Sequence, residues 1–124
     1  MKEKRVFSLY MKSIFHQKKL LQREVFLYAD IPERYGYKLI SQEKHTKQRD
    51  IILRLCFAAG MNLSETQEAL QLYEMPILFP TFSRDRILMQ AFESNYKTIM
   101  DVNAFLIANC EDSLRPCGLI EESY

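Results

Sequence analysis

The fold is decided by residues 22–41, which read QREVFLYADIPERYGYKLIS. This stretch predicts two short helices, about Leu21–Ala29 and Pro32–Ser41, separated by a tight turn at Asp30. Asp tolerates the left-handed conformation of such a turn better than most residues, and Pro32 suits the first turn of the next helix. Apolar residues stand where two steeply crossing helices must touch, at Val25, Ala29, Ile31 and Leu39. The pattern predicts a helix-turn-helix.

Helical periodicity covers most of the remaining chain. Apolar residues recur at spacings of three and four, which predicts further helices at about residues 4–18, 49–59, 65–72, 83–94 and 100–108. Gly60 fits the C-terminal cap of one helix, and Ser64 with Gln67 fits a capping box at the start of the next. The count of 3 Gly and 4 Pro in 124 residues argues against a turn-rich β protein, and the expected fold class is all-α.

The last two predicted helices form a weak copy of the pair before them. The segment Arg49-Asp50-x-Ile52-Leu53-x-x-x-Phe57 matches Arg84-Asp85-x-Ile87-Leu88-x-x-x-Phe92 at an offset of 35. After one inserted residue, Leu63-x-Glu65-x-Gln67-x-x-Leu70 matches Ile99-x-Asp101-x-Asn103-x-x-Leu106 at an offset of 36. This period is typical of stacked helical hairpins, but two copies are too few for a solenoid, and chance similarity stays an alternative.

These patterns divide the chain into three parts. We expect residues 1–74 to form the helix-turn-helix domain and residues 75–110 to form a helical hairpin packed on it. Residues 111–124 are acidic and contain Pro116 and Gly118, so we expect a poorly ordered tail there.

Charge is separated along the chain. Residues 1–50 hold 12 Lys and Arg against 6 Asp and Glu, whereas residues 51–124 hold 5 against 10. The total of +1 hides this separation. A basic N-terminal unit beside an acidic helical remainder favours a polyanion as partner.

Several classes of protein are disfavoured by what the sequence lacks. The 3 cysteines are an odd number without CxxC spacing, which argues against a disulfide framework or a zinc site, and Cys56 lies in an apolar run that suits a reduced core residue. His16 and His45 have no ligand-spaced partners, so we expect no metal and no other cofactor. No glycine-rich elbow or phosphate loop supports an enzyme, and no small-molecule ligand is evident.

The hydrophobic runs are short. Charged residues interrupt the only apolar stretch near the N-terminus, and no run approaches the ~20 apolar residues of a membrane helix. We therefore expect a cytoplasmic protein without a membrane partner.

The second helix of the motif predicts a surface for double-stranded DNA, because such a helix fits the major groove with its early residues at base edges. Arg34 can read guanine through two parallel hydrogen bonds. The expected base contacts are Glu33, Arg34, Tyr37, Lys38 and Ser41. The expected phosphate contacts are Gln22, Arg23, Lys44, His45 and Lys47, with Gln22 at a helix N-terminus that attracts anions.

Two features of this surface have plainer interpretations. Tyr35 and Tyr37 either contact the nucleic acid, or Tyr35 packs in the core and Tyr37 is an ordinary surface residue. The basic run from Lys44 to Arg49 is either a phosphate-binding segment or a solvated loop.

About residues 9–108 resemble the phage-repressor type (Cro/C1, or Xre) of bacterial helix-turn-helix regulator, in a subgroup with a Tyr-Gly-Tyr recognition helix and extra C-terminal helices. The segments that carry the resemblance are YGYKL (35–39), KQRDIIL (47–53) and FAAGMNLSETQ (57–67). The resemblance implies a repressor-like five-helix DNA-binding domain that regulates transcription, usually as a dimer on a palindromic site.

The chain departs from the family pattern in three places. Phe26 stands where the family often has a small residue. The stretch Ser41–Lys47 lacks the glycine and the proline that commonly follow the recognition helix. Glu33 faces the expected groove early in the helix, where a carboxylate can accept from cytosine but repels phosphate.

The sequence therefore favours a sequence-specific, double-stranded DNA-binding transcriptional regulator that uses residues 22–41. The alternative is a protein–protein interaction module on a helix-turn-helix scaffold with weak or no DNA binding. In that alternative the region 79–108 binds a partner protein or a second copy of the chain, because it is rich in aromatic residues: Phe79, Phe82, Phe92 and Phe105. A homodimer through the C-terminal helices is also compatible with DNA binding.

Overall fold

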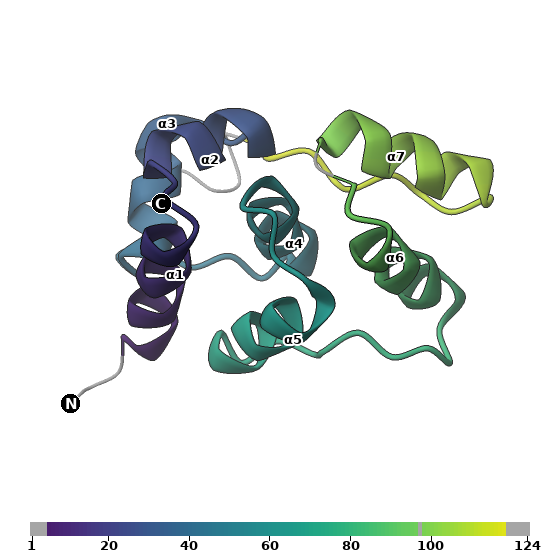
Figure 1. The fold of residues 1–124 in the computed structure, drawn as a ribbon, viewed down its shortest axis with the longest axis horizontal. Coiled ribbons are helices and arrows are strands. Elements are labelled where there is room, and N and C mark those ends of the chain that lie inside the picture. The colour runs from purple at the N-terminus through teal and green to yellow at the C-terminus, as the bar shows by residue number, and fades with distance from the viewer. Residues whose placement is uncertain (1–4, 97, 119–124) are drawn as a thin grey trace.

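The computed structural model describes residues 5–96 and 98–118, and these residues form seven helices and no strand. The expected all-α class is confirmed. The helices α1, α2 and α3 lie at one end of the molecule, α4 and α5 in the middle, and α6 and α7 at the other end (Figure 1). Their bounds are α1 Val6–Gln17, α2 Gln22–Ala29, α3 Glu33–Ile40, α4 Arg49–Ala58, α5 Leu63–Leu72, α6 Ser83–Glu93 and α7 Ile99–Ala108.

The turn between α2 and α3 has the expected form. Asp30 is left-handed, with φ 57° and ψ 50°. The N–H groups of Asp30 and Ile31 donate to the carbonyls of Leu27 and Phe26 over 3.1 and 3.0 Å, which satisfies the end of α2. The four apolar residues expected to join the helices are all buried: Val25, Ala29, Ile31 and Leu39.

The large side chain at Phe26 is matched by a glycine on the facing helix. Phe26 is fully buried, and a Cβ atom added to Gly36 would lie 2.5 Å from two of its ring carbons. Glycine inside a helix costs about 1 kcal/mol relative to alanine. Here the missing side chain lets the Phe26 ring fill the space between α2 and α3.

The hairpins α4–α5 and α6–α7 repeat one local structure. Gly60 and Asn95 are both left-handed, with φ 68° and 59°, in the turns inside the two hairpins. After the hairpins, buried Leu78 and Leu114 each donate their N–H to a side-chain oxygen, of Gln67 (2.9 Å) and Asn103 (2.8 Å) respectively. The similarity seen in the sequence therefore extends over residues 49–80 and 84–116.

Residues 111–118, which we expected in a poorly ordered tail, instead close the second hairpin. They run back past α7 to the end of α2 (Figure 1), and Leu114 is buried. The packing reason is that Leu114 fills the same place in the second hairpin as Leu78 does in the first. The rest of the expected tail, residues 119–124, lies outside the described residues.

The expected capping box at Ser64 and Gln67 is wrong. α5 begins earlier, with Asn62 as its N-cap. The Asn62 side chain accepts from the N–H of Glu65, and the Glu65 side chain accepts from the N–H of Asn62. The Gln67 side chain instead binds the backbone of Leu78: it donates to the carbonyl and accepts from the N–H, both over 2.9 Å.

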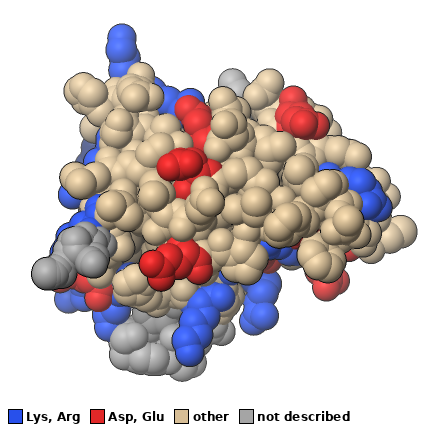
Figure 2. All heavy atoms as spheres, turned by 90° about the horizontal axis from the view of Figure 1, so that it is seen from below, with Lys and Arg blue, Asp and Glu red and all other residues tan. Residues whose placement is uncertain are grey.

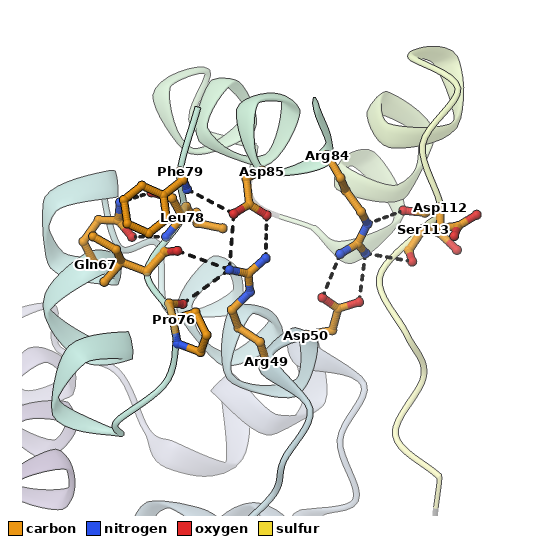
Figure 3. Close-up of polar contacts among 11 residues, drawn as sticks. Arg49, Asp50, Gln67, Pro76, Leu78, Phe79, Arg84, Asp85, Asp112 and Ser113 are labelled. Carbon is orange, nitrogen blue, oxygen red and sulfur yellow. Dashed lines mark hydrogen bonds and ion pairs between the residues drawn. The ribbon is translucent and has the colours of Figure 1, made fainter. Parts of the chain in front are cut away.

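The two hairpins are joined by crossed ion pairs at the starts of α4 and α6 (Figure 3). Arg49 of α4 pairs with Asp85 of α6, and Arg84 of α6 pairs with Asp50 of α4. Burial alone would lower the pKa of Arg84, but the hydrogen bond to Asp50 and the nearby carboxylates of Asp50, Asp112 and Asp85 together raise the pKa overall. Both carboxylates are buried, so the pairs fix the hairpins against each other.

Candidate nucleic-acid interface

α3 turns one side to the core and the other to solvent. The residues on its inner side are buried: Tyr35, Gly36, Leu39 and Ile40. Of the five expected base contacts, three are exposed and two half-buried: Glu33, Arg34 and Tyr37, then Lys38 and Ser41. Because these five positions follow one another at helical spacing, they share the outer side of α3. The structure thus brings the expected base-contact residues onto one surface.

Tyr37 is held in place from behind. Its ring meets the ring of Phe26 edge to face, with 5.0 Å between centroids and 83° between planes. The Tyr37 residue nevertheless stays 42% exposed. Tyr35, in contrast, is buried, so of its two interpretations the structure supports the core residue.

The backbone turns after α3 at Gln42, which follows the C-cap residue Ser41. Gln42 is left-handed with φ 66°, a conformation that glycine adopts more readily. Its side-chain oxygen accepts a 3.0 Å hydrogen bond from the N–H of Ser8 in the first turn of α1. This contact caps α1, which offsets part of the backbone cost at Gln42.

The loop after α3 is fastened at both sides, although it is basic and polar. The N–H of Lys44 donates to the carbonyl of Lys38 (3.1 Å), and the N–H of Thr46 donates to the hydroxyl of Tyr73 (3.0 Å). The ring of His45 lies 5.4 Å from that of Tyr73 and is tilted by 39°. Three expected phosphate contacts therefore lie on an anchored segment, with Lys44 half-buried and His45 and Lys47 exposed.

The other two expected phosphate contacts lie in the first turn of α2. Gln22 is half-buried and Arg23 is exposed. Leu21 is the N-cap residue of this helix and has no side-chain oxygen with which to cap it. The start of α2 is therefore a place where an anion would be stabilised by backbone N–H groups and the basic Arg23.

The ten expected contacts carry mostly positive charge. Among them Glu33 is the only acid, against Arg23, Arg34, Lys38, Lys44 and Lys47. Figure 2 shows one face of the molecule, where Lys and Arg lie mainly along the edges and the middle carries Asp, Glu and uncharged residues. The arrangement suits the backbone of a nucleic acid at the α1–α3 end of the chain.

Sequence reasoning missed Arg54, which joins the end of α2 to Leu114 and Arg115. Arg54 is almost fully buried, and burial lowers its pKa. Its guanidinium donates to the carbonyl of Ala29 at the end of α2 (3.0 Å) and to those of Leu114 (3.1 Å) and Arg115 (2.7 Å). The available signal was a lone charge in the apolar run between Ile51 and Phe57.

Two kinds of site or segment are absent from the part of the chain that the structure describes. Within residues 5–96 and 98–118, no three His, Cys, Asp or Glu side chains gather to hold a metal ion. Among the same residues, every helix is too short or too polar to cross a bilayer.

Comparisons of the chain with protein-family models, with curated proteins and with solved structures found no match.

Proposed function

We propose that this chain is a sequence-specific, double-stranded DNA-binding transcriptional regulator of the repressor-like helix-turn-helix type. The observation that carries the proposal is the outer side of α3, where Arg34, Tyr37 and Lys38 stand on a helix whose inner side is buried behind the left-handed turn at Asp30. The resemblance of about residues 9–108 to phage-repressor regulators favours the same function.

Binding would begin with electrostatic capture of the duplex by the basic end of the molecule. Lys44 and Lys47 would meet phosphates from the anchored loop and fix the register of α3 in the major groove. Arg34 would then donate to guanine, and the ring of Tyr37, held by Phe26, would contact a base edge or a thymine methyl group.

The test is binding to a labelled duplex of random sequence, measured by fluorescence anisotropy over a range of salt concentrations. We expect a log–log slope of about −0.9 for each phosphate that the protein neutralises. Lys47→Ala should reduce the magnitude of that slope by about 1, because it removes one phosphate contact. The matched control is Arg86→Ala, which removes one exposed positive charge from α6 at the other end of the molecule. Arg86→Ala should leave the slope unchanged.

Failure to bind the duplex at low salt would contradict the proposal, as would equal effects of Lys47→Ala and Arg86→Ala. The second outcome would show that binding follows total charge rather than the α2–α3 surface.

A second candidate function is binding of another protein at the α6–α7 end. Met100 and Ile107 on α7 are 79% and 63% exposed. The first hairpin has polar Ser64 and Gln71 at the matching positions of α5, so the fold itself does not require apolar residues there. Phe79 and Phe82 are also exposed, whereas Phe92 is buried and Phe105 half-buried. This candidate is favoured if the chain fails to bind duplex DNA.

A further inference from the structure

The contacts between the two hairpins are reciprocal down to single hydrogen bonds (Figure 3). Arg49 donates to Asp85 of the other hairpin and to the carbonyls of Pro76 and Ile77 in its own. Arg84 donates to Asp50 of the other hairpin (2.8 and 3.0 Å) and to the carbonyls of Asp112 and Ser113 in its own (both 3.1 Å). Each arginine thus binds one aspartate of the other hairpin and two successive backbone carbonyls of its own hairpin.

The two carboxylates complete the exchange. Asp85 accepts a hydrogen bond from the N–H of Phe79 (3.0 Å), and Asp50 accepts one from the N–H of Arg115 (2.9 Å). Phe79 and Arg115 occupy matching positions, one after the buried leucine of each hairpin. Every contact that the first hairpin makes to the second at this site is therefore made in return.

Reciprocity of this kind is the mark of an isologous interface, in which a two-fold axis relates the partners. On such an axis a residue meets its own counterpart. Phe57 and Phe92 do so, because they are matching residues whose rings stack with 3.8 Å between centroids and 7° between planes. The α6–α7 hairpin therefore stands where the hairpin of a second subunit would stand in a symmetric dimer.

The two hairpins differ in the residues on the side that faces away from the other hairpin. Ile51 and Leu55 of α4, which packs against α2, are buried, and so is Ala59, the C-cap residue of the helix. Their counterparts in the second hairpin are Arg86, Gln90 and Ser94, all exposed. Because these positions are polar, a second unit like α1–α3 could not pack on the second hairpin as α1–α3 packs on the first. Of the two similar hairpins, only the first therefore packs against a unit that carries the proposed DNA-contacting helix, α3.

We propose that the chain binds DNA as a single molecule on one unsymmetrical site, since its own second hairpin takes the place of a dimer partner. This inference rests on the proposed function. A symmetric dimer would present two reading helices to two half-sites about 34 Å apart and would select a palindrome. One chain with one α3 selects a single motif without internal symmetry.

The test uses the full chain in two measurements. Sedimentation of the free protein should give the mass of one chain, 14.7 kDa. Duplexes selected from a random pool should share one motif without two-fold symmetry, and a titration should show one chain on each copy of it. On a duplex with two inverted copies, the two chains should bind independently, with a Hill coefficient of about 1 when the sites do not interact.

A control addresses dimerisation through α7. The double variant Met100→Ser with Ile107→Gln places the residues of the first hairpin at these exposed positions without adding charge, and it should leave both the mass and the DNA affinity unchanged. A two-chain mass, an enriched palindrome, cooperative binding to the inverted pair, or a loss of affinity in the double variant would overturn the inference while leaving the proposed function standing. A chain that enriches no duplex contradicts the proposed function, and the inference falls with it.

Discussion

The ring of Phe26 on α2 lies directly against the backbone of Gly36 on α3. An added Cβ atom at Gly36 would come within 2.5 Å of the ring. The same ring meets Tyr37 edge to face. One aromatic residue therefore sets both the distance between the two helices and the position of an exposed tyrosine on the proposed reading surface.

Gly36→Ala should destabilise the protein by about 1–3 kcal/mol, as overpacking does in a well-packed core. A loss of stability would be informative, because alanine in place of glycine inside a helix otherwise stabilises a protein by about 1 kcal/mol. Urea denaturation measures the effect. Adding Phe26→Leu to Gly36→Ala should recover part of the loss by removing ring atoms. A Gly36→Ala protein as stable as the wild type would show that the two helices can move apart at no cost.

The crossed ion pairs predict where energetic coupling occurs. Double-mutant cycles with Arg84→Met and Asp50→Asn should give a coupling energy of about 1–3 kcal/mol, because the pair is hydrogen-bonded twice and its carboxylate is buried. The pair Arg49 and Asp85 should give a similar value.

Matched control cycles use the residues adjacent in sequence, Arg49 with Asp50 and Arg84 with Asp85. Their coupling should be clearly smaller, since no hydrogen bond joins them among the described contacts. Equal coupling within and between the hairpins would argue against the reciprocal arrangement.

The hydrogen bonds of Arg54 should contribute strongly to holding Leu114 and Arg115 against the end of α2. The matching residue of the second hairpin is Met89, so Arg54→Met installs a side chain that this fold already holds at that place. The variant removes hydrogen bonds to three carbonyls, and we expect a loss of about 2–4 kcal/mol in unfolding free energy.

Hydrogen exchange gives a local check of the same contact. Arg54→Met should reduce the protection of the N–H groups of Ile31, beside the turn, and of Leu114 more than that of the N–H of Tyr73 at the end of α5. A uniform reduction over all three would indicate general destabilisation rather than the loss of a specific tie.

Stability should fall at alkaline pH because of Cys56. Burial raises the pKa of this thiol from 9.0 to about 12. The unfolded chain loses the thiol proton first, so this contribution is fully present below pH 9.0 and is lost as the pH rises towards 12. The expected loss is about 1.4 kcal/mol per pH unit in that window.

Comparison with Cys56→Ala isolates the thiol, because the other groups of the chain, including Tyr10 with its raised pKa, are common to both proteins. The stability advantage of the wild type over Cys56→Ala should shrink in urea denaturation between pH 9 and 10.5 by about 2 kcal/mol. Cys110→Ala, at an exposed position, serves as the control and should show no such change relative to the wild type. An advantage that does not depend on pH would contradict the burial of Cys56 in a medium of low dielectric constant.

The features that the sequence predicts well are local. The turn at Asp30 and the burial of Val25 and Leu39 follow from residues within a few positions of each other. Helical periodicity likewise located α4 and α6 to within a residue or two. Short-range spacing is enough for these features because each depends on one helix or one turn.

The features that the sequence did not predict depend on contacts between distant segments. Asn62 with Glu65 and Ser64 with Gln67 have the same spacing, and the choice is decided by Leu78, which uses the Gln67 side chain. The repeat revealed two Arg-Asp pairs, but not that each arginine would bind the aspartate of the other hairpin. These pairings depend on how the two hairpins pack together, which the local sequence pattern does not reveal.

The candidate interface shows the same division. Helical spacing put Arg34, Tyr37 and Lys38 on the outer side of α3, as the structure has them. The supports of that surface come from elsewhere in the chain, with Gln42 capping α1 and Tyr73 anchoring the loop after α3. These contacts join residues 27 or more positions apart, beyond the reach of periodicity.

The most direct test of DNA reading by α3 is selection of duplexes from a random pool by the wild type and by Arg34→Ala in parallel. The wild type should enrich one motif. Arg34→Ala should bind that motif more weakly by about 1–3 kcal/mol and lose its preference at a single base pair. Enrichment of the same motif with undiminished preference at every position would contradict base reading by Arg34, and enrichment of no motif by the wild type would contradict the account as a whole.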